Sequence, residues 1–133
     1  MMKKTGMVGL LMGGLFGLMA WAWAGTVADA TRASLMEARE GLVALLAAAT
    51  PESQNKRLGT IRLATAKVDV LIDKNGEALR EFSEVWRAFK ATRDGELIPG
   101  LLAGKQDEAK ALATGIQAER FKKMLDILGK LDR

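Results

Sequence analysis

The 133-residue sequence contains no histidine and no cysteine. Without imidazole and thiol groups, the chain cannot form Ser-His-Asp or Cys-His catalytic centres, zinc or copper sites of those ligands, or haem held by histidine. It also lacks the C-x-x-C-H, G-x-G-x-x-G and P-loop motifs that bind haem, dinucleotides and phosphates. We therefore expect a protein that is not an enzyme and holds neither a metal nor a cofactor.

Strand signals are also scarce. The chain has no tyrosine, aromatic residues make up only 5%, and no run of residues alternates between apolar and polar. Alanine, leucine, glutamate, lysine and arginine dominate instead, and these residues favour helix. The sequence therefore predicts an all-α fold, which must be stable without disulfide bonds.

The charge is nearly balanced, with 20 basic and 16 acidic residues. Two of the basic residues, Lys3 and Lys4, belong to the N-terminal segment discussed next. What remains is too weakly basic to indicate nucleic-acid binding or a polybasic membrane surface.

The N-terminus has the three parts of a secretory signal peptide. Lys3 and Lys4 precede an uncharged apolar run, and Ala22-Trp23-Ala24 supplies small residues before a cleavage site at Gly25. We expect residues 1–24 to be a signal peptide and residues 25–133 to be a periplasmic domain.

An uncleaved anchor is the alternative for this segment. The uncharged run from Gly6 to Gly25 is long enough to cross a bilayer. The domain would then be tethered to the inner membrane and face the periplasm, and only in that case would the protein be membrane-associated.

Apolar residues recur at intervals of three and four in four segments, which is typical of helices with one buried face. The segments are about 26–49, 51–73, one from about 77, and one from about 106. The expected inward residues are, in chain order, Thr31, Leu35, Ala38, Leu42, Leu45 and Ala49; Leu58, Ile61, Thr65, Val68 and Ile72; Leu79, Phe82, Trp86 and Phe89; and Leu112, Ala113, Ile116, Phe121, Met124, Leu125, Leu128 and Leu131.

Short breaks separate these segments. Thr50 and Pro51 form a helix start, residues 73–76 read as a turn, and Gly104 ends a short piece that begins at Pro99. Short connections place successive helices antiparallel, so we expect an up-down-up-down four-helix bundle.

Five residues are candidates for a ligand site. Arg93 continues the stripe of the third segment, Arg120 lies between inward residues of the fourth, and Trp86 belongs to an aromatic cluster. Each arginine either packs its stem and keeps its head in water, or offers its guanidinium to an anion. Trp86 is either core or part of a ligand box. Arg32 and Arg39, seven residues apart, form a second possible face.

The third and fourth segments resemble the four-helix-bundle sensor domain of bacterial chemotaxis receptors. The resemblance rests on Trp86-Arg87-Ala88-Phe89, on Arg93-Asp94, on the stretch from Leu101 to Ala109, and on Glu119-Arg120. It implies a sensor-like bundle that pairs as a homodimer. Receptors of that family continue into a second membrane span, whereas this sequence stops at Arg133, so the expectation is a free-standing domain.

Two functions follow as expectations. The first is an exported, non-catalytic bundle that binds a small anionic ligand or a membrane receptor. The alternative is a periplasmic structural or chaperone-like protein that acts through protein contacts alone.

Overall fold

The computed structural model describes residues 16–131, with side chains described from Gly25 onward. Nearly all of this part of the chain is helical and no strand occurs in it, which confirms the all-α prediction. The elements are α1 (Phe16–Ala47), α2 (Pro51–Lys74), α3 (Arg80–Thr92), the π-helical turn η3 (Arg93–Leu97), α4 (Ile98–Leu102), α5 (Gln106–Thr114) and α6 (Ile116–Leu131).

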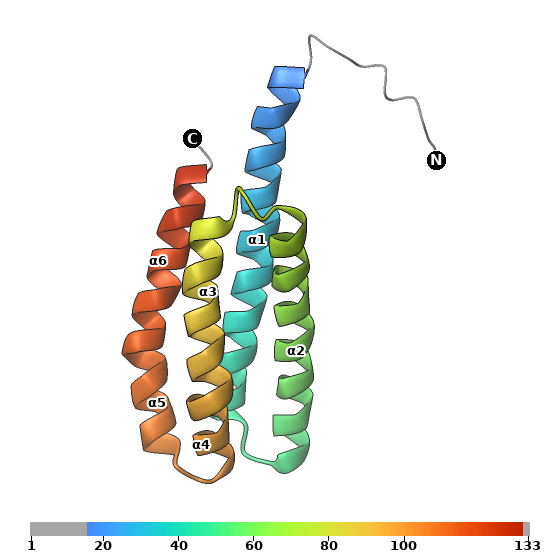
Figure 1. Cartoon of the computed structure of the whole chain (residues 1–133). Helices are drawn as coiled ribbons and strands as arrows, with labels where there is room; N and C mark the ends of the chain where they lie inside the picture. The colour runs from blue at the N-terminus through green and yellow to red at the C-terminus, as the bar shows by residue number, and fades with distance from the viewer. Residues whose placement is uncertain (1–15, 132–133) are drawn as a thin grey trace.

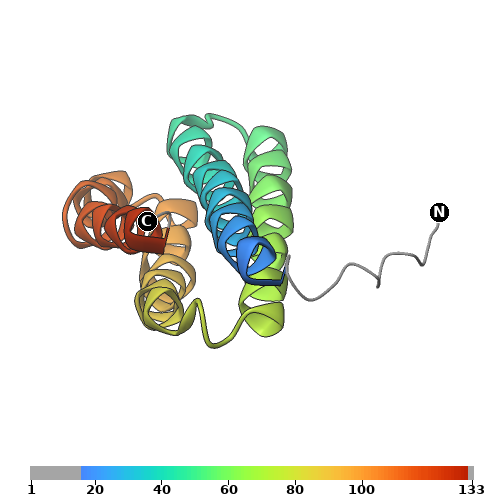
Figure 2. The same ribbon diagram turned by 90° about the horizontal axis from the view of Figure 1, so that it is seen from above.

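The helices pack in pairs. Figure 1 shows α1 beside α2 and α3 beside α6, and the view along the helices in Figure 2 shows the two pairs packed against each other. η3 and α4 extend α3, and α5 leads into α6. Within residues 16–131, no helix has the combined length and apolar character that crossing a bilayer requires.

The first helix is longer than predicted. It begins at Phe16 rather than near Thr26, because the alanine, leucine and methionine before Gly25 are strong helix formers and one glycine does not end a helix. Residues 1–15 of the expected signal peptide lie outside the described residues. At the other end α1 stops at Ala47, so Ala49 lies beyond the helix and is exposed rather than inward.

The second helix begins as predicted. Thr50 caps it by accepting a hydrogen bond from the Ser53 N–H at 3.1 Å, and Pro51 takes the first position. α2 packs closely on α1 at Gly41, where a Cβ atom would lie 2.9 Å from Cγ1 of Ile61. Gly41 therefore sets how closely the two helices approach.

The apolar stripe of α3 is the centre of the core. The four residues predicted inward there, Leu79, Phe82, Trp86 and Phe89, are all at most 2% exposed. α3 itself begins at Arg80, three residues later than expected, after turns that include a buried Asn75.

Beyond α3 the chain makes one π-helical turn. The Ile98 N–H bonds the Arg93 carbonyl, five residues back. From Arg93 onward the buried positions recur every four residues, so Leu97 and Leu101 also lie in the core. The expected short piece at Pro99 is the single-turn helix α4.

The fourth predicted helix is divided by Gly115 into α5 and α6. The break changes the helical phase, so Ile116, predicted inward, is exposed and Gln117 is buried instead. Downstream the prediction is correct for Met124 and Leu128, which have no exposed surface.

Two mid-helix glycines, Gly41 at the α1–α2 contact and the exposed Gly59 of α2, should respond differently to an added methyl group. Gly59→Ala adds a Cβ with no neighbour within 4 Å and should raise the free energy of unfolding by about 0.5–1 kcal/mol through helix propensity. Gly41→Ala should lose that gain because its Cβ displaces Ile61. Urea unfolding of both variants measures the difference, and equal stabilisation would contradict the close α1–α2 packing.

Candidate functional site

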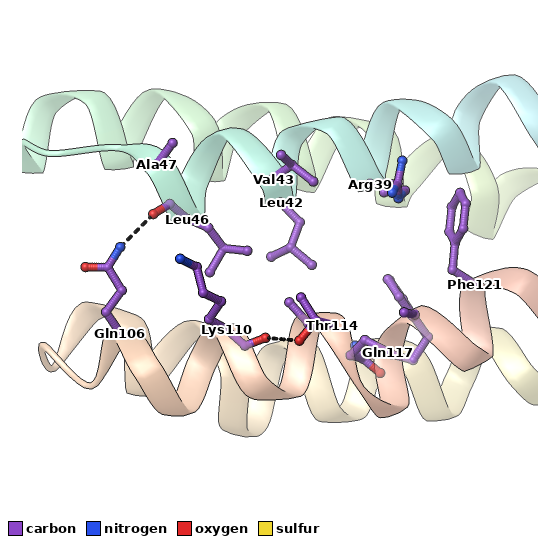
Figure 3. A pocket seen from close by; sticks show the side chains of 13 residues that line it. Arg39, Leu42, Val43, Leu46, Ala47, Gln106, Lys110, Thr114, Gln117 and Phe121 are labelled. Atoms are coloured by element: carbon purple, nitrogen blue, oxygen red, sulfur yellow. Dashed lines mark hydrogen bonds between the residues drawn. The ribbon is translucent and has the colours of Figure 1, made fainter.

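A cleft of about 680 Å³ lies between α1 on one side and α5 and α6 on the other. Figure 3 shows Leu42 and Leu46 pointing from α1 toward the other two helices, and Phe121 pointing back toward α1. Its lining residues are Arg39, Leu42, Val43, Leu46, Ala47, Phe89, Gln106, Lys110, Ala113, Thr114, Gln117, Ala118 and Phe121. The size is typical of small-molecule sites, and the walls are mainly apolar.

The break at Gly115 shapes this cleft. A Cβ at Gly115 would lie 2.9 Å from the Ala111 carbonyl oxygen, so only glycine fits without a shift. α5 buries only Ala109 of its nine residues. Its start is fixed to the end of α1 by the Gln106 side-chain amide, which donates to the Leu46 carbonyl at 3.0 Å. α5 thus borders the cleft without filling it.

The cleft is positively charged. Among the described residues, Arg39 and Lys110 are the only ionisable ones that line it, and both are exposed. The Arg39 guanidinium lies over the Phe121 ring, 4.9 Å from its centroid. This cation–π contact orients the guanidinium at one end of the cleft. Figure 3 shows Lys110 further along, near Leu46, so the two cations lie at separate points along one apolar surface.

Arg120 joins α6 to α3. Its Nη1 donates to the Thr92 hydroxyl at 2.7 Å, the Gln117 side-chain oxygen at 2.9 Å and the Ala88 carbonyl at 3.2 Å. Gln117 in turn donates to the Phe89 carbonyl at 2.9 Å. The described contacts of Arg120 are thus with oxygens of the protein itself.

Trp86 and Arg93 lie together on the other side of α3, facing α2. The Trp86 indole N–H donates to Asp69 at 2.8 Å, and Lys90 donates to the same carboxylate oxygen at 2.9 Å. The Arg93 side chain is 3% exposed, so its head is buried rather than wet. It pairs with Asp94 and lies 5.8 Å from the Trp86 ring centroid. Trp86 itself lies in the core.

Arg32 forms an ion pair with Asp29 at 3.0 Å, one turn earlier on α1. The structure therefore places the five predicted residues at several sites rather than at one. Arg39 lines the cleft, Arg120 joins α6 to α3, Trp86 and Arg93 share the α2–α3 region, and Arg32 is on α1 but is not among the residues that line the cleft. Lys110 and Gln106, which also line the cleft, were not predicted as site residues, and no motif in the sequence distinguishes them.

No group of three or more acidic residues within the described part of the chain is arranged to hold a metal ion. In comparisons with family models, curated proteins and solved structures, nothing matches the chain.

The Gln117 bridge predicts a measurable loss of stability. Gln117→Ala removes a buried amide that bonds Phe89 and Arg120, so the free energy of unfolding should fall by about 1–3 kcal/mol. Gln54→Ala makes the same truncation on α2, outside this contact, and should change stability by less than about 0.5 kcal/mol. If chemical denaturation gives both variants the same midpoint, the bridge does not hold α6 to α3.

Proposed function

We propose that this chain is a non-catalytic, up-down-up-down four-helix bundle that binds an amphipathic anion in the α1–α5–α6 cleft. The domain acts outside the cytoplasm after export by residues 1–24. The absence of histidine and cysteine from the sequence supports a binding role over a catalytic one. The pairing of α1 with α2 and of α3 with α6 supports the topology.

The main support for this proposal is the charge of the cleft. Its walls are mainly apolar, and the described residues that line it include two cations and no carboxylate. A ligand with an alkyl body covers Leu42 and Leu46, and its carboxylate is attracted by Arg39 or Lys110. Burial of each methylene group contributes about 0.8 kcal/mol, which makes the alkyl body the main source of affinity. The exposed cations contribute less each and select the sign of the head group.

A series of straight-chain amphiphiles tests this proposal by isothermal titration calorimetry on the full chain. Octanoate should bind, hexanoate should bind about tenfold more weakly because it lacks two methylene groups, and octyltrimethylammonium should bind at least about tenfold more weakly than octanoate because its head group has the wrong charge. Arg39→Gln with Lys110→Gln should weaken octanoate binding by about tenfold. Arg80→Gln with Lys122→Gln, which removes two exposed cations outside the cleft, should leave it unchanged.

Two results would contradict the proposal. Equal binding of octanoate and octyltrimethylammonium would mean that the cleft selects by apolar contact alone. No binding of any amphiphile would show that the cleft is not a binding site for this class of ligand.

A role in protein contacts, the alternative from the sequence, has one observation in its favour. Leu63 and Val70 lie seven residues apart on α2 and are 64% and 48% exposed. Exposed apolar residues on one helix face are typical of contacts with another protein, either a receptor of the kind that the sensor-domain resemblance implies or a second copy. A monomer at high concentration in sedimentation equilibrium, with Leu63→Ser behaving identically, would argue against the homodimer.

A further inference from the structure

Two buried polar side-chain atoms in the described part of the chain have no hydrogen-bond partner, and both belong to residues that line one cleft. They are the Thr65 hydroxyl oxygen and Nη1 of Arg93. The cleft has a volume of about 350 Å³ and lies between α2 and the η3–α4 segment. An unpaired buried polar atom is costly, so two of them on the walls of the same cleft favour a ligand site there.

The fold holds the Arg93 guanidinium in this position. Arg93 is the first residue of the π-helical turn η3, a type of turn often found at functional sites. Asp94 accepts hydrogen bonds from Nε at 2.8 Å and Nη2 at 3.3 Å. Asp94 itself is 57% exposed, so it covers the outer side of a guanidinium that is otherwise buried. The Nη1 group remains without a partner.

The surrounding charges favour an anion with one negative charge. Two carboxylates, Asp69 and Asp94, line the cleft, and both already accept hydrogen bonds from cationic side chains. Three cations lie in the same group, since Arg62 and Arg93 line the cleft and Lys90 bonds Asp69. One positive charge is therefore in excess, which a monoanion balances and a dianion exceeds.

We propose that this cleft is a second ligand site, which binds a small monocarboxylate between Arg93 and Thr65. Both atoms are buried in the ligand-free chain, so the Thr65 and Arg93 side chains must shift toward the cleft on binding. One carboxylate oxygen then accepts from Nη1 of Arg93 and the other from the Thr65 hydroxyl, and charge-assisted bonds of this kind are strong when buried. Leu58, Ile61 and Ile98 also line the cleft and contact a short alkyl group. None of the lining residues belongs to the α1–α5–α6 cleft, so this proposal stands independently of the proposed function.

The test is a titration of the ¹⁵N-labelled full chain with propionate, followed by NMR through the Arg93 Nε–H and the Thr65 backbone amide. Both signals should shift and saturate, whereas sulfate, a dianion, at equal ionic strength should leave them in place. Thr65→Val keeps the side-chain shape and removes the hydroxyl, so propionate affinity should fall at least about fivefold. Thr60→Val makes the same change on an exposed turn of α2 and should bind propionate as the parent protein does.

Two further measurements separate loss of this site from misfolding and from binding in the first cleft. Without propionate, Thr65→Val should unfold at the same temperature as the parent or higher, because it removes an unpaired hydroxyl. The Arg39→Gln, Lys110→Gln variant should retain the propionate shifts at Arg93, which separates this site from the first cleft. Unchanged propionate affinity in Thr65→Val, equal shifts with sulfate, or no shift at all would each overturn the proposal.

Discussion

The buried face of α3 holds the neighbouring helices in place. Its aromatic residues pack with almost no exposed surface, and stacking continues along the helix, with the Trp86 and Phe89 ring centroids 5.8 Å apart. The polar atoms at its margins hold the neighbours. The Trp86 indole reaches Asp69 of α2, and the Phe89 carbonyl receives Gln117 of α6. One helix thereby fixes the positions of two others.

The cleft beside α1 follows from this arrangement. Because α6 is held against α3 by Gln117 and Arg120, the phase break at Gly115 is absorbed by α5, which buries a single residue. α5 consequently forms a wall that brings Lys110 to the cleft on the side opposite Arg39 of α1. Each carboxylate on the cleft wall would offset one of these two positive charges, and none of the described lining residues carries one.

Periodicity predicted the fold well where one face carries all the large apolar residues, as in α3, and where a cap and proline mark a helix start, as at Thr50. It failed at Gly115, where the helix breaks and the direction of its buried face changes. A pattern of buried positions continued across this break places Ile116 on the wrong face. The site was harder to predict. Arg39 was identified as a candidate, but Lys110 lines the cleft only because α5 is set apart from α6, and that depends on tertiary packing.

Hydrogen exchange along the whole chain tests directly whether α3 organises the molecule while α5 is only weakly held. A backbone amide exchanges when its hydrogen bond opens, and the free energy of that opening reflects how much packing must be lost. We expect the slowest exchange in residues 82–92, and we expect residues 106–114 to exchange faster than α3 and α6. Exchange of α5 as slow as that of α3, or opening of α3 before its neighbours, would show that α3 does not organise the molecule.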